Sequence, residues 1–527
     1  MKFKLFPVPL ADARRCAWAV ALLAWLLVGG CASPLPAPRQ APSHALTNTG
    51  DTRLGRVLSP QVQAHPGLSG FHVFDEPLDA FAARVLLAGA ADRSIDAQYF
   101  IWHDDTVGTL LWQALWAAAE RGVRVRLLLD DANTYGRDPL LAALDAHPNI
   151  ELRLYNPFVY RGSRALGYAS DFARLNRRMH NKSFTADNQA SMVGGRNIAD
   201  EYFGAAGELG FADLDVMAVG PIVAEISRSF DLYWNSASAY PAAAFVGTGG
   251  AAADAALKAR LTAVAADAHA VRYVEAVRAS AFVDRMLSGR IDLDWTTGQL
   301  LYDDPAKTLD GSERNDLLLL PVLKSRMGDP QRSLDIVSPY FVPGPEGTEV
   351  LAALATGGVR VRVLTNSLAS SDESVVHDGY MKRRHDLLRA GVELYEMKPG
   401  AAEGSLRVRG RIGPAKVSGL HAKVFAVDGE RVFLGSFNMD MRSVRLNTEM
   451  GIVIDNPAFA RELGQVFDEG VYEGIYQVVL APDGQNLRWL ERGAAGALKV
   501  YDVEPETTVW KRLQVGFLAG LPIDWLL

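Results

Sequence analysis

The stretch HNKSFTADNQASMVGGRN at residues 180–197 is matched in its spacing by HAKVFAVDGERVFLGSFN at residues 421–438. Counted from the histidine that opens each stretch, a lysine stands at position +2, an aspartate at +7, a glycine at +14 and an asparagine at +17. A single His-x-Lys is ordinarily a surface pair, but five matched positions in two copies indicate a duplicated functional site.

A longer internal repeat surrounds the two motifs. Residue patterns predict a strand, a helix and a second strand in each half, at residues 93–101, 107–120 and 122–130 and again at 332–342, 349–356 and 358–366. The two second strands, GVRVRLLLD and GVRVRVLTN, agree nearly residue for residue. This order builds parallel or mixed sheets covered by helices. We therefore expect an α/β pseudo-dimer of two fused sandwich halves, with one active site where the halves meet.

His180, Lys182, His421 and Lys423 suit the exchange of a phosphodiester. One imidazole can attack phosphorus to form a phosphohistidine, and the other can protonate the departing alkoxide. The two ammonium groups would hold the nonbridging oxygens and place positive charge where negative charge builds up in the transition state. No metal or other cofactor is expected for that task.

Carboxylates are expected to orient the imidazoles. Glu449 follows His421 by 28 residues, and Asp215 lies on a comparable strand after the first motif. Either can accept a hydrogen bond from an imidazole Nδ1–H, although a carboxylate at a strand end is often simply solvated. We count Asp187 and Asp428 with the catalytic residues; because both lie near turns, holding a loop is an equal alternative.

The duplicated pattern resembles that of the phospholipase D superfamily over about residues 75–480. Within it, the residues around the motifs are similar to those of bacterial cardiolipin synthases of the C type, at 175–182, 211–216, 366–369 and 525–527. The resemblance implies two phospholipase D-like halves that condense two phospholipids into cardiolipin through a phosphohistidine. Phosphatidylglycerol, phosphatidylethanolamine or cardiolipin would be the substrates.

The same resemblance assigns roles to the motif residues. His180 would be the nucleophile and His421 the general acid. Lys182, Lys423, Asn197 and Asn438 would bind the substrate phosphate. Resolution of the intermediate by water would instead make the protein a phospholipase, and the same scaffold also carries nucleases. A lipid-binding lipoprotein without catalysis is the alternative from another class, and the sequence does not identify any protein partner.

The N-terminus predicts a lipoprotein signal peptide over residues 1–30. Bases precede fourteen mostly apolar residues, 17–30, fewer than the roughly 20 that cross a bilayer as a helix. LVGGC at residues 27–31 resembles a bacterial lipobox, in which the thiol of Cys31 is acylated. An uncleaved anchor or an ordinary secretory signal is the alternative. We expect a membrane-anchored, periplasm-facing lipoprotein of the bacterial cell envelope.

The remaining boundaries follow composition and the repeat. We expect a Pro-rich tether at 31–70, the first half at 71–240, a helical linker at 241–311, the second half at 312–480 and a C-terminal tail at 481–527. The tail combines aromatic residues, bases and leucines, so it either touches a membrane surface or packs on the domain. Arginines before the first motif form either a solvated face or a rim for anionic lipid head groups, at positions 161, 164, 174, 177 and 178.

Composition excludes several classes of protein. The chain has 527 residues, 49% hydrophobic and 22% charged, so it is neither disordered nor a polytopic membrane protein. Cys16 and Cys31 are the only cysteines, which excludes a disulfide scaffold and a cysteine-built metal site. Loss of the leader would take the net charge from −7 to −10, the wrong sign for nonspecific nucleic-acid binding.

Overall fold

The computed structural model describes residues 35, 41–206, 210–287, 290–310, 314–371, 373–402, 416–469, 474–493 and 497–518. The predicted leader, the lipidation site Cys31 and residues 525–527 lie outside the described residues. Within the described part of the chain, no helix is both long enough and apolar enough to cross a membrane.

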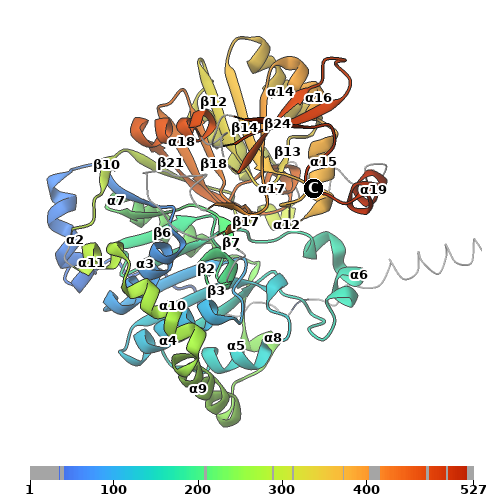
Figure 1. The fold of residues 1–527 in the computed structure, drawn as a ribbon. Helices are drawn as coiled ribbons and strands as arrows, with labels where there is room; N and C mark the ends of the chain where they lie inside the picture. Colours follow the sequence, from blue (N-terminus) through green and yellow to red (C-terminus); the bar gives the residue numbers. More distant parts are fainter. Residues whose placement is uncertain are drawn as a thin grey trace, which may run out of the picture.

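Two large mixed sheets, one in each half, lie against each other (Figure 1). Their strand orders are β10-β1-β8-β6-β5-β2-β3-β4-β9 and β11-β21-β19-β18-β12-β14-β15-β22-β23-β24. The first contains β1 (Ser69–Phe74), β2 (Ser94–Tyr99), β3 (Arg124–Asp130), β4 (Ile150–Tyr155), β5 (Ser183–Ala186), β6 (Ala190–Gly194), β8 (Asp215–Val219), β9 (Ala239–Pro241) and β10 (Asp294–Thr296). The second contains β11 (Gly298–Tyr302), β12 (Ser333–Val337), β14 (Arg360–Asn366), β15 (Glu393–Met397), β18 (Val424–Val427), β19 (Arg431–Gly435), β21 (Met450–Asp455), β22 (Ile475–Leu480), β23 (Leu487–Arg492) and β24 (Leu498–Tyr501). The predicted α/β architecture of two repeated halves is confirmed.

Helices cover the sheets on both sides (Figure 1). Those of the first half are α2 (Arg53–Ala64), α3 (Pro77–Ala90), α4 (Thr106–Glu120), α5 (Asp138–Asp145), α6 (Arg164–Leu175), α7 (Pro221–Trp234), α8 (Ala243–Val246), α9 (Ala251–Ala266), α10 (Ala268–Arg278) and α11 (Ala281–Leu287). Those of the second half are α12 (Lys307–Asp310), α13 (Leu319–Met327), α14 (Gly344–Thr356), α15 (Ser374–Met381), α16 (Arg384–Ala390), α17 (Met441–Arg445), α18 (Pro457–Glu469) and α19 (Val509–Leu518).

The repeated sequence letters form the same buried ion pair in each half. Strands β2 and β3 run parallel, as do β12 and β14. Asp96 accepts two hydrogen bonds from Arg126, at 2.7 and 2.8 Å, and Asp335 accepts two from Arg362, at 2.6 and 2.9 Å. Removing one partner of such a pair would leave an uncompensated buried charge. The match between GVRVRLLLD and GVRVRVLTN therefore reflects a structural ion pair that both halves use, not a part of the active site.

Three predicted boundaries differ from the structure. The expected tether at 31–70 contains α2, whose Leu54 and Leu58 are buried one turn apart, because apolar residues four apart share a helix face. The expected helical linker at 241–311 ends in β10 and β11, which extend one sheet each. Part of the expected tail at 481–527 forms β23 and β24, because their backbone groups pair with the edge of the second sheet.

The two halves share one apolar core. Strands β6 and β8 of the first sheet lie against β19 and β21 of the second. The side chains between them are apolar and fully buried, among them Val193, Val216, Ala218, Val432, Leu434 and Ile452. Burial of such side chains stabilises by about 1.5–3 kcal/mol each, so this interface contributes to the stability of the contact between the halves. Each motif histidine stands just before a central strand, β5 or β18, next to this interface.

Asp187 and Asp428 occupy the turns at the far ends of β5 and β18, with φ of 50° and 55°. The Asp187 carboxylate accepts hydrogen bonds from the main-chain N–H groups of residues 92–94, and that of Asp428 accepts from residues 331–333. A four-residue strand, roughly 13 Å long at 3.3 Å per residue, lies between each aspartate and its histidine. Both carboxylates hold the turn that precedes β2 or β12, which agrees with the loop-holding alternative rather than with a catalytic role.

Candidate active site

Each motif histidine is held by backbone of the other half. Met179 bridges Thr448 in parallel, and the His180 N–H donates to the Thr448 carbonyl at 2.8 Å. In the same way β17 (Lys416–Leu420) runs parallel to β7 (Gly210–Ala212), and the His421 N–H donates to the Ala212 carbonyl at 2.7 Å. The two motifs are therefore brought together by strand pairing between residues more than two hundred positions apart.

The orienting carboxylates are exchanged between the halves. Glu449, from the second half, lies 2.8 Å from Nδ1 of His180, and Asp213, from the first half, lies 2.6 Å from Nδ1 of His421. All four side chains are buried. The expected contact of Glu449 with an imidazole is present, and its partner is the histidine of the other motif.

Asp215 contacts neither histidine, which corrects its expected position. It pairs with Arg84 at 2.9 Å and Arg196 at 3.3 Å, all buried. The register explains the difference: Asp215 faces Gly194, whereas the matching glycine of the second motif, Gly435, faces Gly451. The equivalent of Glu449 in the first half is therefore Asp213, two positions before Asp215.

The glycine at position 195 makes room for this carboxylate. A Cβ added to Gly195 would come within 2.2 Å of an Asp213 carboxylate oxygen. At the equivalent place the second motif has Ser436, whose hydroxyl lies 2.5 Å from Glu449 and donates to it. The first motif therefore has a glycine here because the Asp213 carboxylate approaches the backbone too closely to leave room for a Cβ.

The sequence pattern did not identify two further positioning residues. Asp130 and Asn366 end the equivalent strands β3 and β14, where the repeat offered a signal. Asp130 accepts a hydrogen bond from the Met179 N–H at 2.8 Å, and Asn366 accepts one from the Leu420 N–H at 2.8 Å. Because each holds the peptide just before a motif histidine, the carboxyl ends of the parallel strands fix where the imidazoles point.

The motif lysines make the same main-chain hydrogen bond in the two halves, whereas the motif asparagines differ in their partners. Nζ of Lys182 donates to the His180 carbonyl at 2.6 Å, and Nζ of Lys423 donates to that of His421 at 2.5 Å. The amide of Asn197 donates to the Tyr202 hydroxyl and accepts from a main-chain N–H. Oδ1 of Asn438 is buried with no hydrogen-bond partner in the described chain. Phosphate binding by Asn197 and Asn438 stays a prediction.

Burial and clustered cations favour a neutral imidazole most strongly at His180. Burial, with the charges of Lys182 and Lys423, holds the pKa of His180 well below its ordinary value. Burial and Lys423 also lower the pKa of His421, but ionised Asp213 partly offsets them. Burial lowers the pKa of the Lys182 ammonium as well. The site is therefore poised to move protons rather than to store positive charge.

The two orienting acids have opposite shifts. Burial raises the pKa of Glu449 to about 7, against the opposing charge of Lys182. Burial also disfavours ionised Asp213, but His421 and Lys423 outweigh it and hold its pKa at about 2. His421 thus faces a carboxylate that is charged at any working pH, whereas the partner of His180 titrates near neutrality.

Aromatic rings surround both imidazoles. Phe100 meets His180 edge to face, with ring centroids 5.1 Å apart, and Tyr202 meets His421 likewise at 5.0 Å. Phe211 lies 5.5 Å from His421 on another side. Such walls limit water and strengthen every electrostatic interaction inside the site.

Most arginines ahead of the first motif are structural. Arg161 and Arg164 pair with Asp131. Arg178 pairs with buried Asp130, and Arg174 pairs with a neighbouring aspartate. Four of the five positions therefore serve the loops that carry the motif, and neither the solvated face nor the lipid rim describes them.

Comparison with known proteins assigns the family. The model described as "Cardiolipin synthase, PLD-like domain" matches residues 86–234 and 323–470. The chain is 46% identical to cardiolipin synthase C of Escherichia coli (strain K12) over 480 residues, which are 90% of this chain and all of that protein. This chain belongs to the cardiolipin synthase family. Its two halves are thus phospholipase D-like domains.

More distant relatives share the family or the fold. Cardiolipin synthase A of Pseudomonas putida is 28% identical over 369 residues, 69% of this chain and 60% of that protein. The crystal structure of a phosphatidylserine synthase from Haemophilus influenzae superposes with a TM-score of 0.54 at 14% identity, covering 90% of this chain and all of that one. The likeness in fold to that structure thus extends over both halves described here.

Substitutions at Asp213 and Asp215 should separate the orientation of His421 from the stability of the fold. Asp213→Asn is expected to lower turnover of a phospholipid by roughly 10³–10⁴-fold, because an amide cannot stabilise the imidazolium of His421. Asp215→Asn should instead destabilise the fold by about 3–5 kcal/mol, since it leaves two buried guanidinium groups without their carboxylate. Turnover per folded molecule and unfolding in urea measure the two effects. Equal losses of turnover per folded molecule would contradict the assignment.

The pH dependence of the reaction should follow Glu449. Below its pKa of about 7 this carboxyl is protonated and loses the negative charge that strengthens its hydrogen bond with Nδ1–H of His180, so kcat/KM is expected to rise with pH through about 7. Glu449→Gln should lower activity and abolish this rise. Glu346→Gln, an exposed position of the same half, is the control. An unchanged pH profile in the Glu449 variant would contradict this role.

Proposed function

We propose that this protein is a phosphatidyltransferase that makes cardiolipin from two phospholipids through a phosphohistidine. The observation that carries the proposal is the exchanged pairing of two imidazoles with two carboxylates, beside two buried lysines, in one site. Family membership supports it. A substrate phosphorus between the two rings would meet a nucleophile on one side and a proton donor on the other.

The asymmetry of the two acids supports His180 as the nucleophile. Its imidazole is neutral, and Glu449 holds Nδ1–H, which leaves the Nε2 lone pair free. His421 starts as the imidazolium that ionised Asp213 stabilises. Nε2 of His180 forms the bond to phosphorus, the bond from phosphorus to the head-group oxygen breaks, and His421 gives that oxygen the proton of its own Nε2 and becomes neutral. In the second step the acceptor hydroxyl returns a proton to His421, its oxygen binds phosphorus, and the bond from phosphorus to nitrogen breaks.

The lysines complete the charge balance of the transition state. Lys182 and Lys423 are anchored on the carbonyls of His180 and His421, the two residues that would react. We infer that they bind the nonbridging oxygens, with Asn197 and Asn438 beside them. Fixed donors in a water-poor site need little reorganisation as charge develops.

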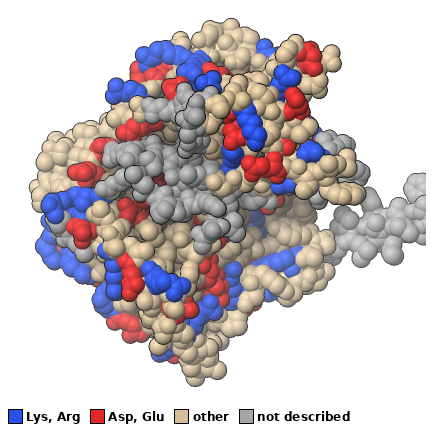
Figure 2. Space-filling view, in the orientation of Figure 1, with Lys and Arg blue, Asp and Glu red and all other residues tan. Residues whose placement is uncertain are grey.

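The competing substrates find less support. Acidic and basic side chains are interspersed on the face shown in Figure 2, and the formal net charge is −7, so a broad basic track for nucleic acid is not apparent there. Both histidines, lysines and orienting acids are in place, which disfavours a lipid-binding protein without catalysis. Hydrolysis and transfer use the same site, and the acceptor distinguishes them.

We infer that the protein works on a membrane surface as a lipoprotein anchored through Cys31 and facing the periplasm. Helix α19 exposes Trp510 and Leu513, 81% and 59% accessible, and α6 exposes Leu166 and Phe172. The two helices lie on the same side of the molecule (Figure 1). Exposed aromatic and leucine side chains favour contact with a bilayer interface.

Products identify the reaction. Purified protein with vesicles of phosphatidylglycerol, alone or mixed with phosphatidylethanolamine, is expected to form cardiolipin, detected by mass. Phosphatidic acid alone would show a phospholipase, and neither product would contradict both. His180→Ala and His421→Ala should each abolish turnover; full activity in either would contradict the division of labour.

A change of leaving group separates the two histidines. A phosphodiester with a nitrophenyl leaving group needs no proton donor, so His421→Ala should cleave it while His180→Ala should not. Rescue of the His180 variant instead would reverse the assignment.

Lipidation can be tested through the two cysteines. In cells labelled with a fatty acid, the wild type should carry the label and Cys31→Ala should not, because the thiol is the acylated group. Cys16→Ala is the matched control and should stay labelled, since it lies within the leader that is removed. Label retained by the Cys31 variant would contradict the lipoprotein assignment.

A further inference from the structure

The segment that joins the two halves carries a buried ion pair. Asp303 follows β11, and Lys307 begins α12. Nζ of Lys307 lies 3.0 Å from Oδ2 of Asp303, and each of the two side chains is 1% accessible. Lys307 also donates to the Ser443 carbonyl at 2.9 Å. Because the desolvation of two charges offsets most of their attraction, stability alone does not account for such a pair.

Asp303 holds both main-chain groups of Glu449. Its carboxylate accepts the Glu449 N–H at 2.8 Å, and its own N–H donates to the Glu449 carbonyl at 3.0 Å. The other carboxylate oxygen accepts the N–H of Leu319 at 2.6 Å. Glu449 in turn lies 2.8 Å from Nδ1 of His180. A chain of contacts therefore runs from Lys307 through Asp303 and Glu449 to the imidazole.

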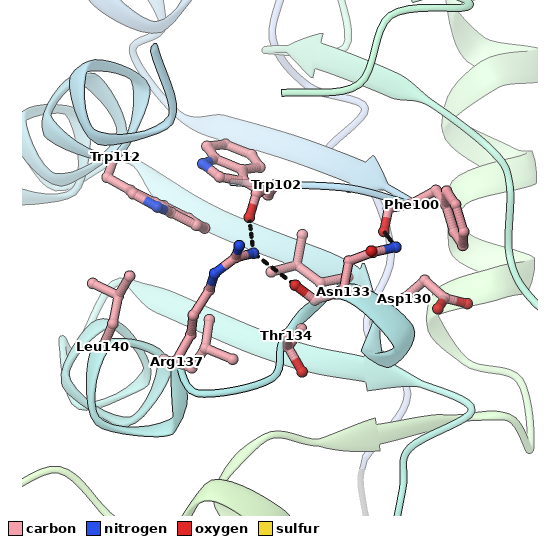
Figure 3. Close-up of a pocket in the computed structure, with 10 residues that line it drawn as sticks. Phe100, Trp102, Trp112, Asp130, Asn133, Thr134, Arg137 and Leu140 are labelled. Carbon is pink, nitrogen blue, oxygen red and sulfur yellow. Dashed lines mark hydrogen bonds between the residues drawn. The ribbon is translucent and has the colours of Figure 1, made fainter. Parts of the chain in front are cut away.

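A second pair of this kind holds the chain next to His180. Asp130 lines one small pocket with Phe100 (Figure 3), and its carboxylate accepts the Met179 N–H at 2.8 Å. The cation of this carboxylate is Arg178, which is 2.7 Å away and also buried. A buried carboxylate with its own cation thus fixes the backbone before the imidazole, and another fixes the backbone of the acid that orients it.

The orienting acid of the other half has a different cation. The carbonyl of Asp213 accepts a hydrogen bond from Arg196, which is buried and stands at position +16 of the first motif. The second motif has Phe437 at this position, so the motif itself supplies no such charge. Lys307 provides the cation for the acid of the second half from outside the motif.

Cations and acids both face the Glu449 carboxyl, in addition to the imidazole. Burial raises the pKa of Glu449 to about 7, and the charges of Lys182 and Lys307 oppose that rise. Burial also raises the pKa of Asp303 and that of Asp440 to about 6, so both are mostly ionised at neutral pH. A nearby cation favours the ionised form of a carboxyl and a nearby anion disfavours it. Lys307 and Asp303 therefore act on this carboxyl in opposite directions.

We propose that Asp303 and Lys307 are positioning residues for the nucleophilic histidine. Asp303 fixes the backbone of Glu449. Lys307 holds Asp303 in place and adds a buried positive charge that favours the ionised carboxyl. The inference rests on the proposed function, in which Glu449 keeps the proton of His180 on Nδ1. Both residues act through Glu449, and the connection between the halves thereby takes part in the reaction.

The pH dependence of phosphodiester cleavage tests this pair. A substrate with a nitrophenyl leaving group needs no proton donor, so its kcat/KM reports the side of the nucleophile. Lys307→Met is expected to move the rise of kcat/KM upward by about one pH unit, because the carboxyl loses a favourable cation. Asp303→Asn should move the rise downward by about one pH unit, because Lys307 is then unopposed. Asp303→Asn should also lower the plateau roughly tenfold, because the hold on Glu449 is weaker.

Arg384→Met is the matched control for the loss of a buried cation. Arg384 pairs with Glu396 at 3.1 Å and lies on α16, which packs on β15, five strands from β21 in the second sheet. This variant should unfold at a lower urea concentration and keep the wild-type midpoint in pH. Shifts of both single variants in one direction, an equal shift in the control, or a loss of kcat/KM without any shift would overturn the role of the pair.

The background Glu449→Gln keeps the test decisive where a single variant does not fold. Asp303→Asn combined with Lys307→Met leaves neither charge unpaired and is expected to lower kcat/KM roughly tenfold. In the Glu449→Gln background the same double substitution should cause no further loss, because the group through which it acts is already absent. Wild-type kcat/KM in the folded double variant, or an undiminished loss in that background, would contradict the proposal.

Infrared spectra distinguish failure of this pair from failure of the proposed function. A carboxyl band that is present in the wild type and absent in Glu449→Gln reports the titration of Glu449 without turnover. Its midpoint should move upward in Lys307→Met and downward in Asp303→Asn even if no cardiolipin is formed. A fixed midpoint would overturn the pair, whereas a moved midpoint in a protein that turns over no phospholipid would contradict the proposed function alone.

Discussion

The exchanged hydrogen bonds between the halves are the constraint on which the site depends. Glu449 of the second half orients His180 of the first, and Asp213 of the first half orients His421 of the second. The backbone repeats this exchange, because the residue before each histidine pairs with the residue before the other half's acid. Neither half therefore holds a complete set of orienting groups, and the shared apolar core is a condition for chemistry as well as for stability.

Burial of so many ionisable groups in one place decides their charge states. Two lysines, two histidines and two acids lie within an apolar and aromatic surround, where unpaired charge is costly. Asp213 remains ionised because cations outweigh its burial, whereas burial dominates at Glu449 and raises its pKa to about 7. Two similar motifs thus acquire different proton affinities from their surroundings, which is what a nucleophile and a general acid require.

Residues that recur at the same spacing in both halves have two different roles. Some stabilise the fold: the ion pairs of Asp96 with Arg126 and of Asp335 with Arg362, and the turn aspartates Asp187 and Asp428. Others serve the site. Duplication preserves both equally, so the regular position of an aspartate after each histidine looked catalytic although its carboxylate holds a turn at the far end of the strand.

The sequence by itself determined the duplication, the strand–helix–strand order and the histidine and lysine pair of each motif, because these follow from local spacing. Glu449 was also recognised, but its partner was not. The prediction named Asp215 instead of Asp213, because only the register of the paired strands decides between two aspartates that are two residues apart. The exchange of orienting carboxylates between the halves was decided by tertiary structure alone, since it joins residues that no local pattern connects.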